Sequence, residues 1–167
     1  MNLKTNFEKF KNIFFKRENI IIFLLIVIIF FLDRYSKILI INNFNKNSFY
    51  LNDFINYNLT WNTGIGFGLL NFGSYVFYNL ITVIIGFVIS IILYLTFISK
   101  KTDKIIFSII CGGALGNFYD RIIFNAVPDF IDIHYNDFHW FTFNIADIFI
   151  TLGIISYLIR GFLVKNS

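Results

Sequence analysis

The sequence has few of the cysteine and histidine residues from which metal sites and cysteine nucleophiles are built. Its 167 residues include one cysteine, one proline and two histidines. A single cysteine excludes an intramolecular disulfide, and no cysteine and histidine residues stand at metal-ligand spacing. Cys111 lies inside an apolar stretch, and neither His134 nor His139 lies in the core of such a stretch to act as its base. We therefore expect a buried packing role for this cysteine.

Charged residues are also scarce. They make up 14% of the chain, against about a quarter of a soluble domain. Hydrophobic residues account for 57% of the chain and aromatic residues for 21%. This composition excludes an ordinary soluble domain and predicts a membrane protein.

Four apolar stretches approach or exceed the roughly 20 residues that a helix needs to cross about 30 Å of hydrocarbon. We expect these spans at about 19–41, 75–98, 104–123 and 141–163. Four spans are too few strands to close a barrel, so each is predicted to be a helix. The sequence thus predicts an all-α membrane protein, with residues 1–167 in a single domain. A small strand-like extracytoplasmic subdomain is expected from the outer loops.

The position of the basic residues explains the net charge of +4 without a nucleic-acid partner. They gather before the first span, between spans two and three, and after the fourth: Lys4, Lys9, Lys11, Lys16, Arg17, Lys100, Lys101, Lys104, Arg160 and Lys165. The other two loops hold only Lys46. By the positive-inside rule, both termini and the central loop face the cytoplasm, and residues 42–74 and 124–140 lie on the outer side.

The basic flank followed by an apolar run is also typical of a signal peptide. However, a charged segment at 33–37 follows where a small-residue cleavage site would be expected. We therefore expect the first span to be an uncleaved anchor helix.

Two aspartates lie in apolar surroundings near the predicted outer surface. Asp129 stands in the segment Val-Pro-Asp-Phe-Ile-Asp, and Asp147 stands at the head of the last apolar stretch. An ionised carboxylate is poorly solvated there, so such residues are functional-site hypotheses by default. Two of them a short loop apart indicate a pair that shares one proton, the arrangement by which an acid and a base activate water.

A glycine-rich segment in the first outer loop has two readings. Residues 58–62 alternate in a strand-like manner and lead into Gly64, Gly66 and Gly68. Glycines permit positive φ angles and close approach of the backbone to a ligand. A plain interfacial turn with aromatic belt residues explains the pattern equally well, so both readings stay open.

The third span combines small residues with polar ones. Gly112 and Gly116 have the four-residue spacing that lets helices pack closely. Packing does not explain Asn117, Asp120 and Arg121, which recur at three- and four-residue steps and so share a helix face. In the first span, a second i, i+4 pair consists of Asp33 and Lys37, which we expect to form a structural salt bridge at the interface.

Two other classes of protein are weighed against an enzyme. A transporter or proton channel would use the same carboxylates as relay groups, and such a pathway needs ionisable groups across the whole membrane. Here Asp33, Asp120 and Asp147 are all expected at one depth in its outer third. No inverted repeat between the two halves is evident either. A purely structural or assembly protein leaves the pair of aspartates unexplained.

Five polar motifs occur in a fixed order from the first span to the last. They are Asp33-x-x-Ser-Lys37, Asn62-x-Gly64-x-x-Phe67-Gly68, Gly112-Gly113-x-x-Gly116-Asn117-x-x-Asp120-Arg121, Val127-x-Asp129-Phe130 and Phe143-Asn144-x-Ala146-Asp147. This order closely resembles the lipoprotein signal peptidases, the bacterial signal peptidase II family, in chain length and four-span layout as well. One departure is Ile65-Gly66, where family members more often have small alanine-like residues.

The resemblance implies an aspartic endopeptidase that removes signal peptides from diacylglyceryl-modified prolipoproteins, cleaving N-terminal to the lipidated cysteine. It implies a place in the bacterial cytoplasmic (inner) membrane, with the active site near the extracytoplasmic face. By motif match, Asp129 and Asp147 are the catalytic dyad. The match assigns substrate binding to Asn62, Gly64, Asn117, Arg121 and Asn144, and structural support to Asp33, Lys37, Gly113, Asp120 and Ala146. Membrane lipids are further partners, no metal or cofactor is needed, and we expect a functional monomer.

The predicted topology can be tested by cysteine labelling of whole cells or spheroplasts. Ser48→Cys and Asn136→Cys should react with a membrane-impermeant thiol reagent added outside, because both positions lie in the predicted outer loops. Thr102→Cys should stay unlabelled until the membrane is opened. The reverse pattern would invert the topology and place the two aspartates on the cytoplasmic side.

Overall fold

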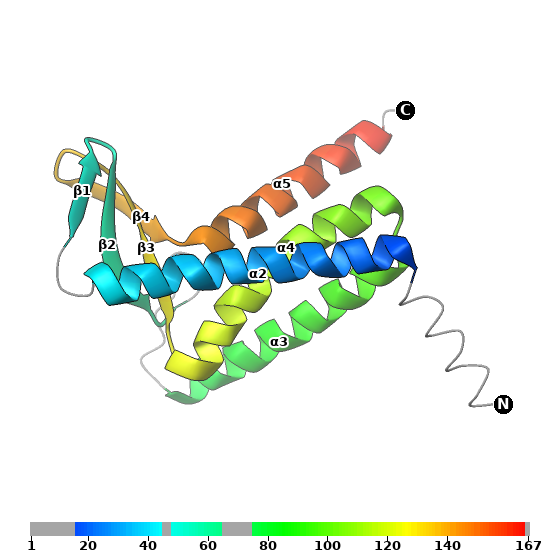
Figure 1. Cartoon of the computed structure of the whole chain (residues 1–167), viewed down its shortest axis with the longest axis horizontal. Helices are drawn as coiled ribbons and strands as arrows, with labels where there is room; N and C mark the ends of the chain where they lie inside the picture. Colours follow the sequence, from blue (N-terminus) through cyan, green and yellow to red (C-terminus); the bar gives the residue numbers. More distant parts are fainter. Residues whose placement is uncertain (1–15, 45–47, 65–74, 166–167) are drawn as a thin grey trace.

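The computed structural model describes residues 16–44, 48–64 and 75–165, which form a helical bundle with a small antiparallel sheet at one end (Figure 1). The helices within these residues are α2 (Arg17–Phe44), α3 (Tyr75–Ile98), α4 (Lys101–Phe124) and α5 (Ile145–Lys165). The strands are β1 (Phe49–Asn52), β2 (Ile55–Asn62), β3 (Val127–Tyr135) and β4 (Phe138–Phe143).

Helix α4 holds the bundle together, since it packs against α2, α3 and α5. Glycines allow the close approach. A Cβ built on Gly112 would lie 2.8 Å from the Cβ of Ile29 in α2, and one on Gly113 would lie 2.6 Å from the carbonyl oxygen of Ala146 in α5. Real atoms do not approach so closely, so any larger residue at these two positions would push the helices apart. The close packing expected from the small residues is therefore present.

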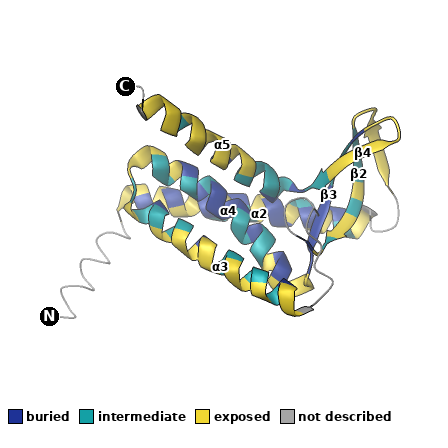
Figure 2. Cartoon of the chain, turned by 180° about the vertical axis from the view of Figure 1, so that it is seen from behind, coloured by how far each residue is buried: buried dark blue, intermediate teal, exposed yellow. Residues whose placement is uncertain are grey.

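Many of the large apolar residues are exposed on the outside of the bundle. Exposed residues cover much of the outer side of the helices in Figure 2. Two helical segments, Val76–Ile98 and Ile145–Val164, are long and apolar enough to cross a membrane. Helices α2 and α4 instead carry buried ionic side chains within their length. The structure has a helix at each of the four predicted spans, and α3 coincides with its predicted bounds. Four membrane crossings and cytoplasmic termini stay predictions.

The sheet has the order β1-β2-β3-β4, and each neighbouring pair is antiparallel. Strand β2 covers the alternating run that the sequence analysis identified, so the strand-like subdomain is present. Strand β3 lies in the middle of the sheet and is mostly buried (Figure 2). It runs from the end of α4 toward the tip of the sheet, and β4 returns the chain to α5 (Figure 1).

The last helix begins later than predicted. Residues 141–143 belong to β4, where Phe141 pairs with Ile133 and Phe143 pairs with Ile131. The helix starts only after Asn144, whose side-chain oxygen accepts the backbone N–H of Asp147 at 3.1 Å, while the Asp147 carboxylate accepts the backbone N–H of Asn144 at 3.2 Å. This reciprocal capping fixes the start of α5 and puts Asp147 in its first turn.

A buried ionic network joins α2 to α4. The Lys37 ammonium is fully buried and donates to the carboxylates of Asp33 and Asp120, both at 2.7 Å, and to the side-chain oxygen of Asn117 at 2.8 Å. Arg34 pairs with the other carboxylate oxygen of Asp120. These contacts use all three protons of the ammonium group and satisfy both carboxylates.

The same network reaches α5. The second carboxylate oxygen of Asp33 accepts the backbone N–H of Ala146 at 2.9 Å, in the first turn of that helix. Because the first N–H groups of a helix lack partners within it, the Asp33 side chain supplies one from α2. Lys37 and Asp33 therefore fix three helices at the end of the bundle that adjoins the sheet.

Removing the Lys37 charge should destabilise the protein strongly. Lys37→Met leaves two buried carboxylates short of a cation, a change that costs about 3–5 kcal/mol of unfolding free energy. Thermal or denaturant unfolding in detergent measures the loss. Lys104→Met is the matched control, since the only side-chain partner of Lys104 among the described residues is the neutral amide oxygen of Asn19. The loss for this variant should be about 1 kcal/mol. Equal losses would show that the network adds nothing beyond ordinary hydrogen bonding.

Candidate active site

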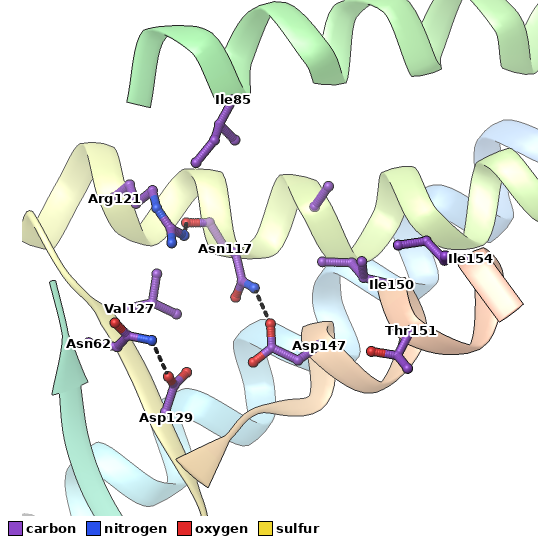
Figure 3. A pocket seen from close by; sticks show the side chains of 11 residues that line it. Asn62, Ile85, Asn117, Arg121, Val127, Asp129, Asp147, Ile150, Thr151 and Ile154 are labelled. Carbon is purple, nitrogen blue, oxygen red and sulfur yellow. Dashed lines mark hydrogen bonds between the residues drawn. The ribbon is translucent and has the colours of Figure 1, made fainter. Parts of the chain in front are cut away.

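Asp129 and Asp147 line the same cavity, although they come from different elements. Asp129 is the third residue of β3 and Asp147 lies in the first turn of α5, and both point into the space beneath α4 (Figure 3). The cavity has a volume of about 340 Å³. It is lined by Asn62, Ile85, Ala114, Asn117, Arg121, Val127, Asp129, Asp147, Ile150, Thr151 and Ile154.

Asp129 is held by two amide groups. Asn62 donates to one carboxylate oxygen at 2.8 Å, and Asn144 donates to the other at 2.5 Å. Asn62 is the last residue of β2, beside the start of β3. Its own side-chain oxygen accepts the backbone N–H of Gly64 at 2.8 Å, which turns its NH₂ group toward Asp129.

Asp147 receives its donors from α4 and from the residue before α5. The Asn117 amide donates to one carboxylate oxygen at 2.7 Å (Figure 3). The oxygen of that amide already accepts a proton from Lys37. Because an ammonium group can only donate, this contact decides which way the Asn117 amide faces and presents its NH₂ group to Asp147.

Asn144 connects the two aspartates. Its amide nitrogen donates to Asp129, and its amide oxygen accepts the backbone N–H of Asp147. The Asp147 carboxylate in turn accepts the backbone N–H of Asn144. One fully buried residue therefore contacts both carboxylates, Asp129 through its side chain and Asp147 through its backbone. A residue with the same shape but only donors or only acceptors would break one of these contacts.

The pKa of Asp129 is raised to about 7, first because the carboxyl group is buried and second because the Asp147 charge lies nearby. The hydrogen bonds from Asn62 and Asn144 act in the opposite direction and lower it. A carboxyl group with this pKa is still about half protonated at neutral pH, whereas an ordinary aspartate is fully ionised there. Next to a second carboxylate, it gives a site in which one acid and one base are available together.

Arg121 lies at the edge of the cavity with donor capacity to spare. Its guanidinium donates to the backbone oxygen of Gly64 at 3.2 Å and to that of Asn117 at 3.3 Å. Its Nε is buried and has no hydrogen-bond partner within the described part of the chain. A buried donor without a partner is costly, so this group is suited to bind an acceptor on a substrate.

Asp132, three residues beyond Asp129 on β3, does not line the cavity. Its carboxylate contacts Nδ1 of the exposed His139 at 2.6 Å on β4. Residues three apart on a strand point to opposite faces, which explains why Asp132 lies away from the cavity that Asp129 lines.

In the described ranges, no three histidine, cysteine, aspartate or glutamate side chains gather in a way that would hold a metal ion.

The structure brings the predicted site residues together in two groups. Those lining the cavity or bonded directly to its aspartates are Asn62, Asn117, Arg121, Asp129, Asn144 and Asp147. Those behind it, in the ionic network or at the α4 and α5 contact, are Asp33, Lys37, Gly113, Asp120 and Ala146. Gly64 contacts Arg121, whereas Ile65, Gly66, Phe67 and Gly68 lie outside the described residues.

Sequence reasoning missed the apolar wall of the cavity and the role of Arg34. Ile150, Thr151 and Ile154 follow Asp147 at steps of three, four and seven residues, which is the helical spacing of one face. That spacing was visible in the sequence. Arg34 carried a weaker signal, since only the folded structure places it beside Asp120.

The site can be compared with known proteins. The family model described as signal peptidase (SPase) II matches residues 25–163. A lipoprotein signal peptidase of Pelagibacter ubique is 42% identical over 146 residues, with 86% of this chain and 88% of that protein covered. Another, from Anaplasma marginale, is 38% identical over 136 residues, with 80% of this chain and 79% of that protein covered.

Two solved structures of bacterial membrane enzymes have the same fold. Each superposes with a TM-score of 0.69 over 87% of this chain. Their identities are 32% and 30%, and the matched regions cover 88% and 94% of their own chains. The family model, the relatives and the shared fold agree over nearly the same residues, and the chain therefore belongs to the signal peptidase II family.

Proposed function

We propose that this protein is a membrane aspartic endopeptidase that removes signal peptides from prolipoproteins and cleaves N-terminal to a diacylglyceryl-modified cysteine. The observation that carries the proposal is the pair of carboxylates in one cavity, joined through Asn144, with the pKa of Asp129 raised to about 7. Membership in a peptidase family supports hydrolysis of a peptide bond. The names of the relatives support lipoproteins as the substrate class.

In the proposed reaction, Asp147 is the base and Asp129 the acid. The first turn of α5 stabilises negative charge on Asp147, while the raised pKa of Asp129 keeps its proton available. Asp147 takes a proton from water, whose oxygen attacks the scissile carbonyl carbon. Asp129 hydrogen-bonds the carbonyl oxygen as it gains charge. The C–N bond then breaks, and a proton from the dyad passes to the leaving amine.

The remaining cavity residues fit a peptide in an apolar segment. Ile85 of α3 and Ile150 and Ile154 of α5 form apolar walls, and α4 lies between them with Asn117 and Arg121 (Figure 3). A peptide that enters such a space must satisfy its polar backbone groups. The Nε of Arg121, which has no partner among the described residues, and the nearby amide side chains supply donors for the carbonyl oxygens of the peptide.

Loss of either carboxylate should abolish cleavage. Asp129→Asn and Asp147→Asn each remove half of the acid and base pair, so turnover should fall by about 10³-fold or more while the protein still inserts. The assay uses purified protein in detergent with a lipidated prolipoprotein peptide. Asp132→Asn is the matched control and should stay active, because Asp132 points away from the cavity. Substantial activity in Asp129→Asn or Asp147→Asn would remove that residue from the reaction.

The dependence of kcat/KM on pH should report the proton of Asp129. If Asp129 acts as the acid, activity should decline as pH rises through the pKa of that group, which is about 7 in the free protein. The hydrogen bond from Asn62 lowers this pKa, so Asn62→Ala should raise it and move the alkaline limb to higher pH. If the alkaline limb of Asn62→Ala stays in place, the group that titrates is not Asp129.

A further inference from the structure

A second cavity adjoins the candidate active site. It has a volume of about 380 Å³ and lies between the β3–β4 hairpin and the first turns of α5. Its lining residues are Ile133, Phe141, Phe143, Asp147, Ile148, Thr151 and Leu152. Asp147 and Thr151 line this cavity and the first one as well. The two cavities are therefore separated by little more than one ridge of α5.

Helix geometry explains how the ridge divides them. Asp147 and Thr151 stand four residues apart and so lie one above the other on α5. Ile150 and Ile154 lie to one side of this pair and line the first cavity. Side chains at 148 and 152 lie to the other side and line the second. The Asp147 carboxylate therefore has a cavity on each flank.

The two cavities differ in chemistry. The first offers amide and guanidinium donors, which suit a peptide backbone. In the second, every lining residue except Asp147 and Thr151 is aliphatic or aromatic. Leu152 is 54% exposed and Phe141 is 41% exposed, so its rim reaches the outside of the bundle. A peptide would leave polar groups unpaired there, whereas a hydrocarbon chain would not.

We propose that the second cavity binds an acyl chain of the diacylglyceryl group on the substrate cysteine, an inference that rests on the proposed function. The bond to be cleaved lies directly before that cysteine. With the scissile carbonyl at the dyad, the signal peptide extends to one side and the thioether-linked lipid begins one residue beyond it on the other. The polar cavity receives the end of the signal peptide, and the apolar cavity across the Asp147 ridge receives the lipid.

Filling the cavity tests the proposal. Leu152→Trp places a larger side chain at its rim, and Leu163→Trp is the matched control, an exposed leucine three helical turns further along the same face of α5. Each protein is assayed with one peptide whose cysteine carries two short acyl chains or two long ones. For Leu152→Trp, KM should rise about tenfold or more with the long-chain peptide, since excluding even two methylenes has that effect. With the short-chain peptide, the kcat/KM of Leu152→Trp should stay within about twofold of the parent value.

Three results would overturn the proposal. The first is a chain-length dependence that is the same in Leu152→Trp and Leu163→Trp, which would leave both acyl chains in the surrounding lipid or detergent. The second is an equal loss on short and long chains, which would indicate a structural effect or a bound bilayer lipid. The third is cleavage by the parent protein that does not depend on chain length. A parent protein that cleaves neither peptide would refute the proposed function itself.

Photocrosslinking provides a measurement that needs no cavity variant. The protein is Asp129→Asn, which we expect to bind the substrate without cleaving it, and the long-chain peptide carries a diazirine midway along one acyl chain. Light should attach the lipid to residues of β4 and the first two turns of α5. Labelling confined to α3, or spread evenly over the exposed helices, would overturn the proposed position of the chain.

Discussion

The burial of charge at one end of the bundle is the constraint on which the structure depends. Lys37 is fully buried, and two carboxylates and one amide oxygen accept hydrogen bonds from its ammonium group. A buried charge without such partners would be strongly destabilising. Those partners come from α2 and α4, and Asp33 also binds the first turn of α5. The same ammonium group orients Asn117 toward Asp147. A contact that stabilises the helices therefore also sets the geometry of the candidate site.

Asn144 plays the corresponding part on the sheet side. It directly follows β4, caps α5 and donates to Asp129 on β3, so one residue links the start of the helix to both aspartates. Helix N-terminal N–H groups need partners in any fold. Here the partners are supplied by Asp33 and by Asn144, which ties the capping of α5 to the site. The contacts that cap α5 therefore also place the two aspartates.

Several predictions from the sequence agree with the structure for identifiable reasons. The bounds of α3 coincide with the predicted span, since a long uninterrupted apolar run has one stable conformation when its backbone must bond internally. The strand-like outer run is β2. The start of the last helix was wrong by four residues, because Phe141 and Phe143 satisfy an apolar pattern equally well as strand residues paired with β3. The pairing with β3 and the helix cap at Asn144 decide that these residues form a strand instead of a helix.

The sequence by itself determined a membrane protein with long apolar helices, and its ordered motifs indicated the signal peptidase II family and a pair of aspartates. Composition and local spacing carry that information, because hydrophobicity and helical period are properties of neighbouring residues. The tertiary structure decided which polar groups meet. Asn62, Asn117 and Asn144 are far apart in sequence, and only the packing of β2, α4 and α5 brings their amides to the two carboxylates. It also decided that Asp147 has a polar cavity on one side and an apolar cavity on the other, since that division depends on which surfaces cover each face of α5.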